Sequence, residues 1–570
     1  MPDYPDLPNT DLLDRIPLDA RVVLDVGCGA GALGAAYRQR NPRARILGIE
    51  QQREAAQRAS HRLDAVANAD VEQVPLPFAL SGGLDCIVYG DVLEHLKDPW
   101  SVLRRHAEAL SDNGTMLLCI PNVEHWSFAA RLLHGGWDYE DAGLFDRTHL
   151  RWFTLESTRR GLEALGLAPC DVHARVFDPE RLNAFVAAMT PALRNMGIDP
   201  QSYAGRAGPL QYVWRVRKRP VARMTVAATM LTPVGGVSHT RIVHPLQAMT
   251  TDPAVHTHLV TSGDLPATNP ETPRILVLHR PVLAGEAGLE QLCRIIAAGW
   301  VVITEFDDHP DFLAAMQREE QRTFTGVHAV QTSTPALADI LHPRNPEVQV
   351  FPNAIRALPK PRNFTDPARL TLFFGALNRE ADWQPLMGAL KAVAGTAGDR
   401  LRFSVVHDRA FFEALQTEHK SFTPTADYET YLRLLGETEI ALMPLADTPF
   451  NRAKSDLKFI EAGACRVATL ASHVVYGASV EDGRTGLLFH GADDMRARLL
   501  RLIAMPELAR NLGDAARNYV AGQRMLAYQV ADRIAWYRSL WDRRAELTET
   551  LRARVAHPAL DAALGKVPAA

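Results

Sequence analysis

The chain has 570 residues, too many for one hydrophobic core, so its length indicates several domains. Hydrophobic residues make up 47% and charged residues 22%, which excludes a disordered or fibrous chain. A formal net charge of −4 provides no basic field for a phosphate backbone, so we expect no nucleic acid partner.

Six cysteines are scattered without a CxxC pair or a close Cys/His cluster. This spacing argues against structural zinc and a disulfide framework, and we expect a cytoplasmic protein. The acidic, proline-rich segment MPDYPDLPNTDLLDRIP differs from a signal peptide. No apolar run approaches the roughly 18 residues of a membrane span, which leaves peripheral membrane contact open.

Short apolar, β-branched runs alternate with helix-like stretches from residue 21 to about 216. The runs are RVVLDVG, RILGIE, LDCIVYG and TMLLCIP. Such alternation predicts βαβ units around a mostly parallel sheet. The basic segment RVRKRPVAR interrupts the rhythm, and we therefore place the first domain at residues 1–218.

The same alternation restarts at residue 224, and again after the proline-rich segment FPNAIRALPKPRNFTDP. A helical tail follows from residue 493 to about 554. The units share rhythm but not sequence, so they are not solenoid repeats. The predicted fold class is α/β with three consecutive Rossmann-like, doubly wound sheets. We assign residues 219–360 to the second domain and 361–570 to the third, with closing helices.

The turn after the first predicted strand carries the run DVGCGAG at residues 25–31. Glycines there let the backbone approach a ligand closely. Dinucleotide-binding enzymes use a similar turn, so the run alone leaves both kinds of ligand open. The glycines fall at every second position behind an aspartate, unlike the usual pyrophosphate-binding spacing, which favours a ligand without phosphate.

Acidic residues follow the next predicted strands at positions suited to a nucleoside. Glu50 ends RILGIE, where a carboxylate can accept hydrogen bonds from both ribose hydroxyls. Asp70 lies in a loop that can reach an adenine amine, and Asp91 follows LDCIVYG.

The motifs DVGCGAG, Glu50, DVLEHLKDP, the Asn113-Gly114 turn, IPN and HLRWFT occur in this order. Residues 24 to about 167 therefore resemble class I S-adenosylmethionine-dependent methyltransferases, in the branch that includes the ubiquinone-biosynthesis O-methyltransferase and sugar methyltransferases of surface-polysaccharide pathways. The resemblance implies S-adenosylmethionine as methyl donor. The binding residues that it implies are Asp25, Gly27, Gly29, Gly31, Glu50, Asp70 and Asp91.

Two histidines are candidates for catalysis. Methyl transfer from a sulfonium is an in-line displacement, in which a hydroxyl acceptor benefits from a base. His149 and His95 suit that role because imidazole titrates near neutral pH. The alternatives are that His95 packs its helix and that His149 orders a lid by a hydrogen bond. We expect Tyr139 and Asp146 to shape the acceptor site.

A second group of candidates lies in PFNRAKSDLKFIEAGA, residues 449–464. Basic and small polar residues at a helix start can bind a diphosphate, and a glutamate two turns further can accept ribose hydroxyls. The alternative is a solvated basic face with Glu461 in ion pairs. A glycine pair after MTVAATML suits either an anionic ligand or a plain tight turn. The candidate residues are Gly235, Gly236, Arg452, Lys454, Ser455, Lys458 and Glu461.

The GG loop, STPAL, VFPN, FFGALN, PFNRAKSDLKFIEAGA and EDGRTGLLF follow one another after residue 226. Residues 226 to about 543 thereby resemble the two-domain GT-B glycosyltransferases of the group 1 type, which hold a nucleotide sugar between facing sheets. Lys454 stands in place of the first of two family glutamates, whereas Glu461 matches the second. We interpret this as a subfamily trait, which leaves donor contacts and stereochemistry open.

Asp307-Asp308-His309 ends the run WVVITEF, and adjacent carboxylates can bind Mn²⁺ or Mg²⁺. We favour acceptor binding or a structural turn at this place and expect no metal.

The two resemblances lead to one hypothesis. The chain would be a bifunctional enzyme that transfers a methyl group and a sugar during assembly of a bacterial surface glycan or glycoconjugate, with a carbohydrate or lipid-linked glycan as acceptor. Two alternatives remain: the C-terminal half only binds glycan, or it is a docking platform for a methyltransferase of phenolic or lipid hydroxyls. The oligomeric state is left open.

Overall fold

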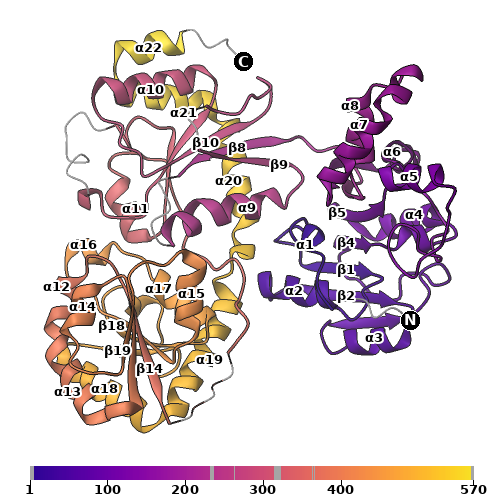
Figure 1. Ribbon diagram of the computed structural model, residues 1–570. Coiled ribbons are helices and arrows are strands. Elements are labelled where there is room, and N and C mark those ends of the chain that lie inside the picture. Colours follow the sequence, from indigo (N-terminus) through magenta and orange to yellow (C-terminus); the bar gives the residue numbers. More distant parts are fainter. Residues whose placement is uncertain are drawn as a thin grey trace. The chain divides into compact units, whose positions relative to one another are not determined.

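The computed structural model describes residues 6–230, 236–261, 264–312, 322–362, 364, 366 and 368–565. They form three mostly parallel sheets with helices, which confirms the predicted α/β class (Figure 1). Contacts divide the chain into two compact units, Met1–Arg223 with Thr250–Ala254, and Met224–Met249 with Val255–Ala570. Among the described residues, none of the helices has both the length and the apolar character that crossing a membrane requires.

The sheet of the first unit has seven strands in the order β3-β2-β1-β4-β5-β7-β6. They are β1 (Val22–Val26), β2 (Arg45–Glu50), β3 (Ala65–Asn68), β4 (Leu84–Gly90), β5 (Leu110–Pro121), β6 (Ala168–Arg175) and β7 (Gln211–Arg217). β7 runs antiparallel to both of its neighbours, and the other pairings are parallel. The strand order reverses between β1 and β4, where open α/β sheets bind ligands at the carboxyl ends.

Helices cover both faces of this sheet. They are α1 (Thr10–Leu13), α2 (Ala32–Arg40), α3 (Arg53–Ala59), η1 (Leu93–His95), α4 (Pro99–Ala109), α5 (Trp126–Leu133), α6 (Leu155–Ala164), α7 (Pro179–Asn195) and α8 (Pro200–Ala207). Successive strand residues point to opposite faces. Leu24 and Ile87 accordingly join one core cluster, whereas Val23 and Cys86 join another. Burial on both faces explains why these strands appear in the sequence as continuous apolar runs.

The second unit holds two six-stranded sheets in which every pairing is parallel. The order of the first sheet is β13-β12-β11-β10-β8-β9, with β8 (Met224–Thr229), β9 (Val255–Val260), β10 (Arg274–His279), β11 (Val301–Glu305), β12 (Ala329–Thr332) and β13 (Val348–Val350). The order of the second is β16-β15-β14-β17-β18-β19, with β14 (Leu370–Gly375), β15 (Leu401–Val406), β16 (Lys420–Thr423), β17 (Ile440–Met443), β18 (Ala468–Ser472) and β19 (Leu487–Phe489).

The longer helices of this unit are α9 (His244–Thr250), α10 (Gly285–Ala297), α11 (Pro335–Leu341), α13 (Met387–Ala397), α14 (Arg409–Ala414), α15 (Tyr428–Gly436), α17 (Leu457–Ala464), α18 (Ala492–Ala504), α19 (Pro506–Gln523), α20 (Val530–Asp542), α21 (Arg544–Val555) and α22 (Pro558–Leu564). The last three return to the first sheet of the unit, where α22 packs on α10. Leu551 and Leu560 belong to that sheet's core cluster. The closing helices therefore pack on the β8–β13 sheet, although they follow the β14–β19 sheet in sequence.

Candidate functional site

The glycine turn follows β1 at the reversal of strand order. Gly27, Gly29 and Gly31 have φ of 69°, 53° and 80°, a region that other residues rarely adopt. A Cβ on Gly27 would lie 2.5 Å from Val92 Cγ2, so this glycine lets the turn lie against the loop after β4. A Cβ on Gly29 would have none of the described residues within 4 Å, apart from its chain neighbours. The turn thus has one packed side and one free side on which a ligand can lie.

Glu50, the last residue of β2, holds this turn in place. Its Oε2 accepts a hydrogen bond from the Gly29 amide at 2.9 Å, and its Oε1 accepts one from the Gln52 amide at 2.8 Å. Asp25 lies buried next to it, and burial together with the charge of Glu50 raises the pKa of Asp25 to about 7. The structure therefore brings the predicted glycines, Asp25 and Glu50 together.

Asp70 and Asp91 lie at the same edge of the sheet, after β3 and β4. The carboxylate of Asp70 accepts hydrogen bonds from the Glu72 amide at 2.9 Å and the Gln73 side chain at 2.8 Å. Asp91 has φ of 56° and accepts a hydrogen bond from the Gln211 side chain. A non-glycine residue in this region is strained, and such strain is concentrated at functional sites.

His95 and His149 meet beyond the end of β4, with ring centroids 4.9 Å apart at 65°. The amides of Leu150 and Arg151 donate to the Glu94 carbonyl at 2.7 and 3.0 Å, which fixes HLRWFT against DVLEHL. Burial lowers the pKa of His149, and His95 acts in the same direction, so His149 is neutral near pH 7. A neutral imidazole is the state that a general base requires.

Glu94, which sequence reasoning did not select, lies buried beside the two histidines. Burial raises the pKa of its carboxyl group well above the usual range, and the charges of Asp91 and Asp146 act in the same direction. The available signal was its position directly before His95 in DVLEHL, because a residue next to a candidate catalytic residue in a tight turn often lies in the same site.

Aromatic side chains lie beside His149. The His149 and Trp152 rings are 5.7 Å apart, and Trp152 lies 5.9 Å from Trp137. Trp137 is 39% exposed and Trp152 37% exposed, so both present an apolar face to solvent. Asp146 accepts hydrogen bonds from the Thr148 amide and hydroxyl, whereas Tyr139 is exposed.

In the second unit, the segment between α16 and α17 follows strand β17 of the β14–β19 sheet. Two of its residues contact residues that follow strands of the β8–β13 sheet. Lys454 Nζ lies 3.0 Å from Asp308 Oδ1, and Asn353 Nδ2 donates to Ser455 Oγ at 2.8 Å. Asp308 follows β11 and Asn353 follows β13, while the segment lies between α16 (Pro449–Arg452) and α17. The predicted residues Lys454 and Ser455 therefore lie where carboxyl ends of both sheets meet.

Lys458 and Glu461 extend this group along α17. Glu461 is 3% exposed and accepts a hydrogen bond from the Tyr428 hydroxyl at 2.9 Å. Burial raises its pKa to about 7. Lys458 donates to the Gly375 carbonyl, and burial lowers its pKa to about 8.

Gly236 joins the same place from the loop after β8. A Cβ on Gly236 would lie 2.4 Å from Tyr428 Cε2, so only glycine permits this approach without displacing the ring. His239 stacks on Tyr428 with centroids 5.3 Å apart. Gly235 lies outside the described residues.

The two aspartates after β11 are paired with cations. Arg280 Nε lies 2.7 Å from Asp307 Oδ1, and Asp308 pairs with Lys454. Arg379, which sequence reasoning did not select, forms an ion pair with Asp382 at 3.2 Å. Burial lowers the pKa of Lys454, and the positive charge of Arg379 acts in the same direction. It follows the matched run FFGALN directly, which was the available signal.

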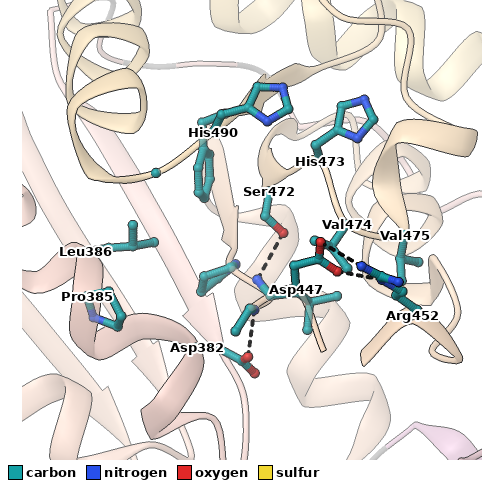
Figure 2. A pocket seen from close by; sticks show the side chains of 15 residues that line it. Asp382, Pro385, Leu386, Asp447, Arg452, Ser472, His473, Val474, Val475 and His490 are labelled. Atoms are coloured by element: carbon teal, nitrogen blue, oxygen red, sulfur yellow. Dashed lines mark hydrogen bonds and ion pairs between the residues drawn. The ribbon is translucent and has the colours of Figure 1, made fainter. Parts of the chain in front are cut away.

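Arg452 points in a different direction. It lines a pocket of about 610 Å³ at the carboxyl ends of β17, β18 and β19, where its exposed guanidinium pairs with Asp447 at 2.6 Å (Figure 2). The stacked rings of His473 and His490, 5.0 Å apart, border the same pocket. Asp382 in its wall accepts a hydrogen bond from the Ala446 amide at 2.8 Å. The structure thus separates Arg452 from Lys454, although the two are neighbours in sequence.

The first unit matches a known protein family. Residues 6–172 match the family model described as a methyltransferase domain. The N-terminal unit contains a methyltransferase domain. The glycine turn, Glu50 and both candidate histidines all belong to the matched residues.

Curated relatives match the methyltransferase domain. The ubiquinone biosynthesis O-methyltransferase of Xanthomonas campestris pv. campestris is 27% identical over 191 residues, 31% of this chain and 79% of that protein. That of Pseudomonas paraeruginosa is 31% identical over 113 residues, 19% and 48% of the two chains. The trans-aconitate 2-methyltransferase of Afipia carboxidovorans is 30% identical over 117 residues, 20% and 44%. The chain spans less than half of the length of the latter two.

Solved structures resemble both units at low identity. Sucrose-phosphate synthase from Thermosynechococcus elongatus has a TM-score of 0.40 and 16% identity, covering 56% of this chain and 100% of that one. An S. aureus TarM variant in complex with fondaparinux, alpha-GlcNAc-glycerol and UDP has 0.37 and 12%, covering 46% and 55%. A SAM-dependent methyltransferase from Archaeoglobus fulgidus has 0.27 and 16%, covering 37% and 90%. Similarity at this level does not determine an activity for the second unit.

Proposed function

We propose that the chain is a bifunctional transferase that methylates a hydroxyl with S-adenosylmethionine and transfers a sugar from a nucleotide sugar to a glycan acceptor. The observation that carries the proposal is the presence of two separate clusters of candidate residues. One is formed by the glycine turn and Glu50, and the other by Lys454, Lys458 and Glu461 at the meeting of two sheets.

The first cluster suits S-adenosylmethionine, which supplies a methyl group on a sulfonium when bound. The open space beside Gly29 leaves room for a nucleoside against the turn. Glu50 lies at the end of β2, from which its carboxylate can accept ribose hydroxyls, and Asp70 follows the adjacent strand β3. Asp25 and Asp91 bring further carboxylates for the cationic amino-acid part. A neutral His149 can take the proton of an acceptor hydroxyl.

The second cluster suits a nucleotide diphosphate. Lys454, Lys458 and Arg379 provide cations that can stabilise a departing diphosphate. The N-cap residue of α17, Asp456, makes no capping hydrogen bond, because its carboxylate pairs with Arg524 at 2.5 Å. The first amides of α17 can then bind a phosphate. Glu461, once ionised, can accept hydrogen bonds from ribose hydroxyls.

A carbohydrate or lipid-linked glycan is the acceptor that we propose for both reactions. The exposed faces of Trp137 and Trp152 beside His149 provide an apolar surface of the kind on which a sugar ring can stack. We further propose the division into domains 1–218, 219–360 and 361–570, a cytoplasmic location and a role in surface-glycan assembly.

The test uses the full chain with labelled S-adenosylmethionine and a panel of nucleotide sugars and glycan acceptors, followed by mass spectrometry of the acceptors. We expect one acceptor to gain a methyl group and a sugar. Glu50→Ala should abolish only methylation and Glu461→Ala only sugar transfer. Absence of nucleotide-sugar turnover across the panel would contradict the sugar-transfer half.

A second candidate function follows from Lys454. This residue replaces an expected glutamate and is already paired with Asp308, which favours a C-terminal half that binds glycan without transferring sugar. The affinity for a nucleoside diphosphate separates the two functions. A transferase binds it, and Glu461→Ala weakens the binding, whereas a pure glycan-binding module shows no such affinity.

A further inference from the structure

Three potential metal ligands converge at the end of β4 in the methyltransferase domain. One ligand atom each from Glu94, His95 and His149 lies within 4.8 Å of the other two. Glu94 and His95 belong to η1, and His149 comes from the segment that the Leu150 and Arg151 amides hold against Glu94. The backbone therefore fixes the spacing of the three side chains from both segments.

Glu94 is the unusual member of this cluster. Its residue is 1% exposed, and neither carboxylate oxygen has a hydrogen-bond partner in another described residue. Buried polar groups are normally paired, and an unpaired buried carboxylate is costly. The Nδ1 atom of His149 is also buried, and no described residue offers it a hydrogen-bond partner. The Glu94 carboxylate and the His149 imidazole therefore lie close together, and each has a buried polar atom without a hydrogen bond to another described residue.

The third ligand, His95, is oriented from behind. Its Nδ1 lies 2.9 Å from the Thr148 hydroxyl and 3.3 Å from the Thr148 carbonyl. The carbonyl can only accept, and the hydroxyl donates to Asp146 Oδ1 at 2.6 Å, so Nδ1 of His95 carries the proton. Its Nε2 then presents a lone pair. Metal-binding histidines are typically held in this way by a hydrogen bond to the other ring nitrogen.

We propose that Glu94, His95 and His149 bind a divalent transition metal ion of the zinc type. Two imidazoles and one carboxylate form a ligand set that proteins use for Zn²⁺ and for other first-row divalent metals. Three protein ligands leave at least one coordination position open, as in catalytic rather than structural sites. The ion supplies the positive charge that the buried carboxylate of Glu94 lacks.

The site adjoins the glycine turn. Val92, two residues before Glu94, packs against Gly27, and the exposed rings of Trp152 and Trp137 border His149. The open position can hold the acceptor oxygen, an assignment that rests on the proposed methyl transfer. In the metal-bound form His149 is a ligand, and the ion replaces it as the group that activates the acceptor hydroxyl. The acceptor oxygen bonds to the methyl carbon as the carbon–sulfur bond breaks, the electron pair stays on sulfur, and the hydroxyl proton passes to water. A metal favours this step by lowering the pKa of the bound hydroxyl.

Metal binding is measured on the full chain after removal of metals with a chelator. Zn²⁺ titration by calorimetry should show a site that Glu94→Gln and His149→Asn each weaken at least about 100-fold. Co²⁺ should give visible absorption bands that both variants lose. The control His61→Asn alters an exposed histidine outside the cluster and should leave both signals unchanged. Equal binding by the wild type and both ligand variants would overturn the proposal, as would the absence of a Zn²⁺ site in the wild type.

A milder change keeps the test valid if a ligand variant fails to fold. Thr148→Val removes the hydroxyl behind His95 and should weaken Zn²⁺ about tenfold, whereas Thr148→Ser should restore it. Unchanged affinity in Thr148→Val would count against the orientation argued for His95.

S-adenosylmethionine binding to the metal-free chain, measured separately, tests the proposed methyl transfer on its own. If the chain binds Zn²⁺ but not S-adenosylmethionine, the metal site is supported and its role in methyl transfer is contradicted. If the chain binds S-adenosylmethionine but not Zn²⁺, the metal site is contradicted and the proposed methyl transfer is unaffected.

Discussion

Lys454 and Asp308 form an ion pair at 3.0 Å that joins the α16–α17 segment to the carboxyl end of β11. Both side chains are mostly buried, at 16% and 11% exposure. The position that the sequence comparison flagged as a departure from the glycosyltransferase pattern is therefore filled by a residue with a defined partner.

Replacing Lys454 should lower both the stability of the second unit and its affinity for a nucleoside diphosphate. Lys454→Met leaves Asp308 with the more distant Arg280 at 3.9 Å, so the loss in the free energy of unfolding should stay below the about 3–5 kcal/mol typical of a buried charge left unpaired. Thermal unfolding and nucleoside-diphosphate titration measure the two effects. Adding Asp308→Asn to Lys454→Met should recover stability but not affinity. Full recovery of affinity in the double variant would show that Lys454 does not contact the diphosphate.

Gly236→Ala should reduce nucleotide affinity, because its Cβ would lie 2.4 Å from the Tyr428 ring that holds Glu461. The matched control is Gly395→Ala in α13, where a Cβ meets nothing within 4 Å. That control should stabilise the protein by up to about 1 kcal/mol, as alanine does within a helix. Chemical unfolding and calorimetric titration distinguish the two variants. Similar behaviour of both would contradict the close approach of the loop to Tyr428.

Nucleotide binding should depend on pH through Glu461, whose pKa is raised to about 7 by burial. In the proposed function the ionised carboxylate accepts two ribose hydroxyls, so affinity should fall roughly tenfold per unit as the pH drops below 7. Glu461→Gln should bind weakly with little dependence between pH 5 and 8.

The same group has the opposite effect on stability. The native state holds the Glu461 proton up to a higher pH than the unfolded chain, so this contribution is complete below the ordinary pKa and is lost as the pH rises toward 7. Urea unfolding of the wild type and Glu461→Gln across this range measures it. A stability difference that does not change with pH would contradict the raised pKa.

Glu50→Ala should weaken S-adenosylmethionine binding by about 10- to 100-fold, since hydrogen bonds to a charged group contribute roughly 1.5–3 kcal/mol. The change also frees the Gly29 amide. Glu54→Ala, an exposed acidic residue in the first turn of α3, is the control and should bind normally. Calorimetry with the wild type and both variants gives the comparison. Equal loss in both would attribute the effect to general charge rather than to Glu50.

The sheets and the glycine turn could be predicted because their signals are local. Strands buried on both faces appear as apolar runs, as in β1 and β14, and the DVGCGAG glycines all adopt the expected positive φ. Side-chain direction is not local in this sense. Arg452 and Lys454 are two positions apart, yet α16 ends between them and sends one to Asp447 and the other to Asp308.

Partners distant in sequence also escaped prediction. The pairing of Lys454 with Asp308 joins segments 146 positions apart. Glu94 was missed for another reason: its significance lies in the absence of a hydrogen-bond partner for a buried carboxylate, and a sequence records neither burial nor pairing.

The return of α21 and α22 to the β8–β13 sheet has a consequence for how the protein is made. Leu551 and Leu560 complete a core whose other members, such as Leu276 and Val302, are synthesised some 250 positions earlier. During synthesis the β8–β13 sheet keeps part of its apolar face exposed until α21 and α22 have been made, whereas the β14–β19 sheet can fold before then. The middle of the chain therefore reaches its final state last, and a fragment that ends before α21 should aggregate even though it contains every strand.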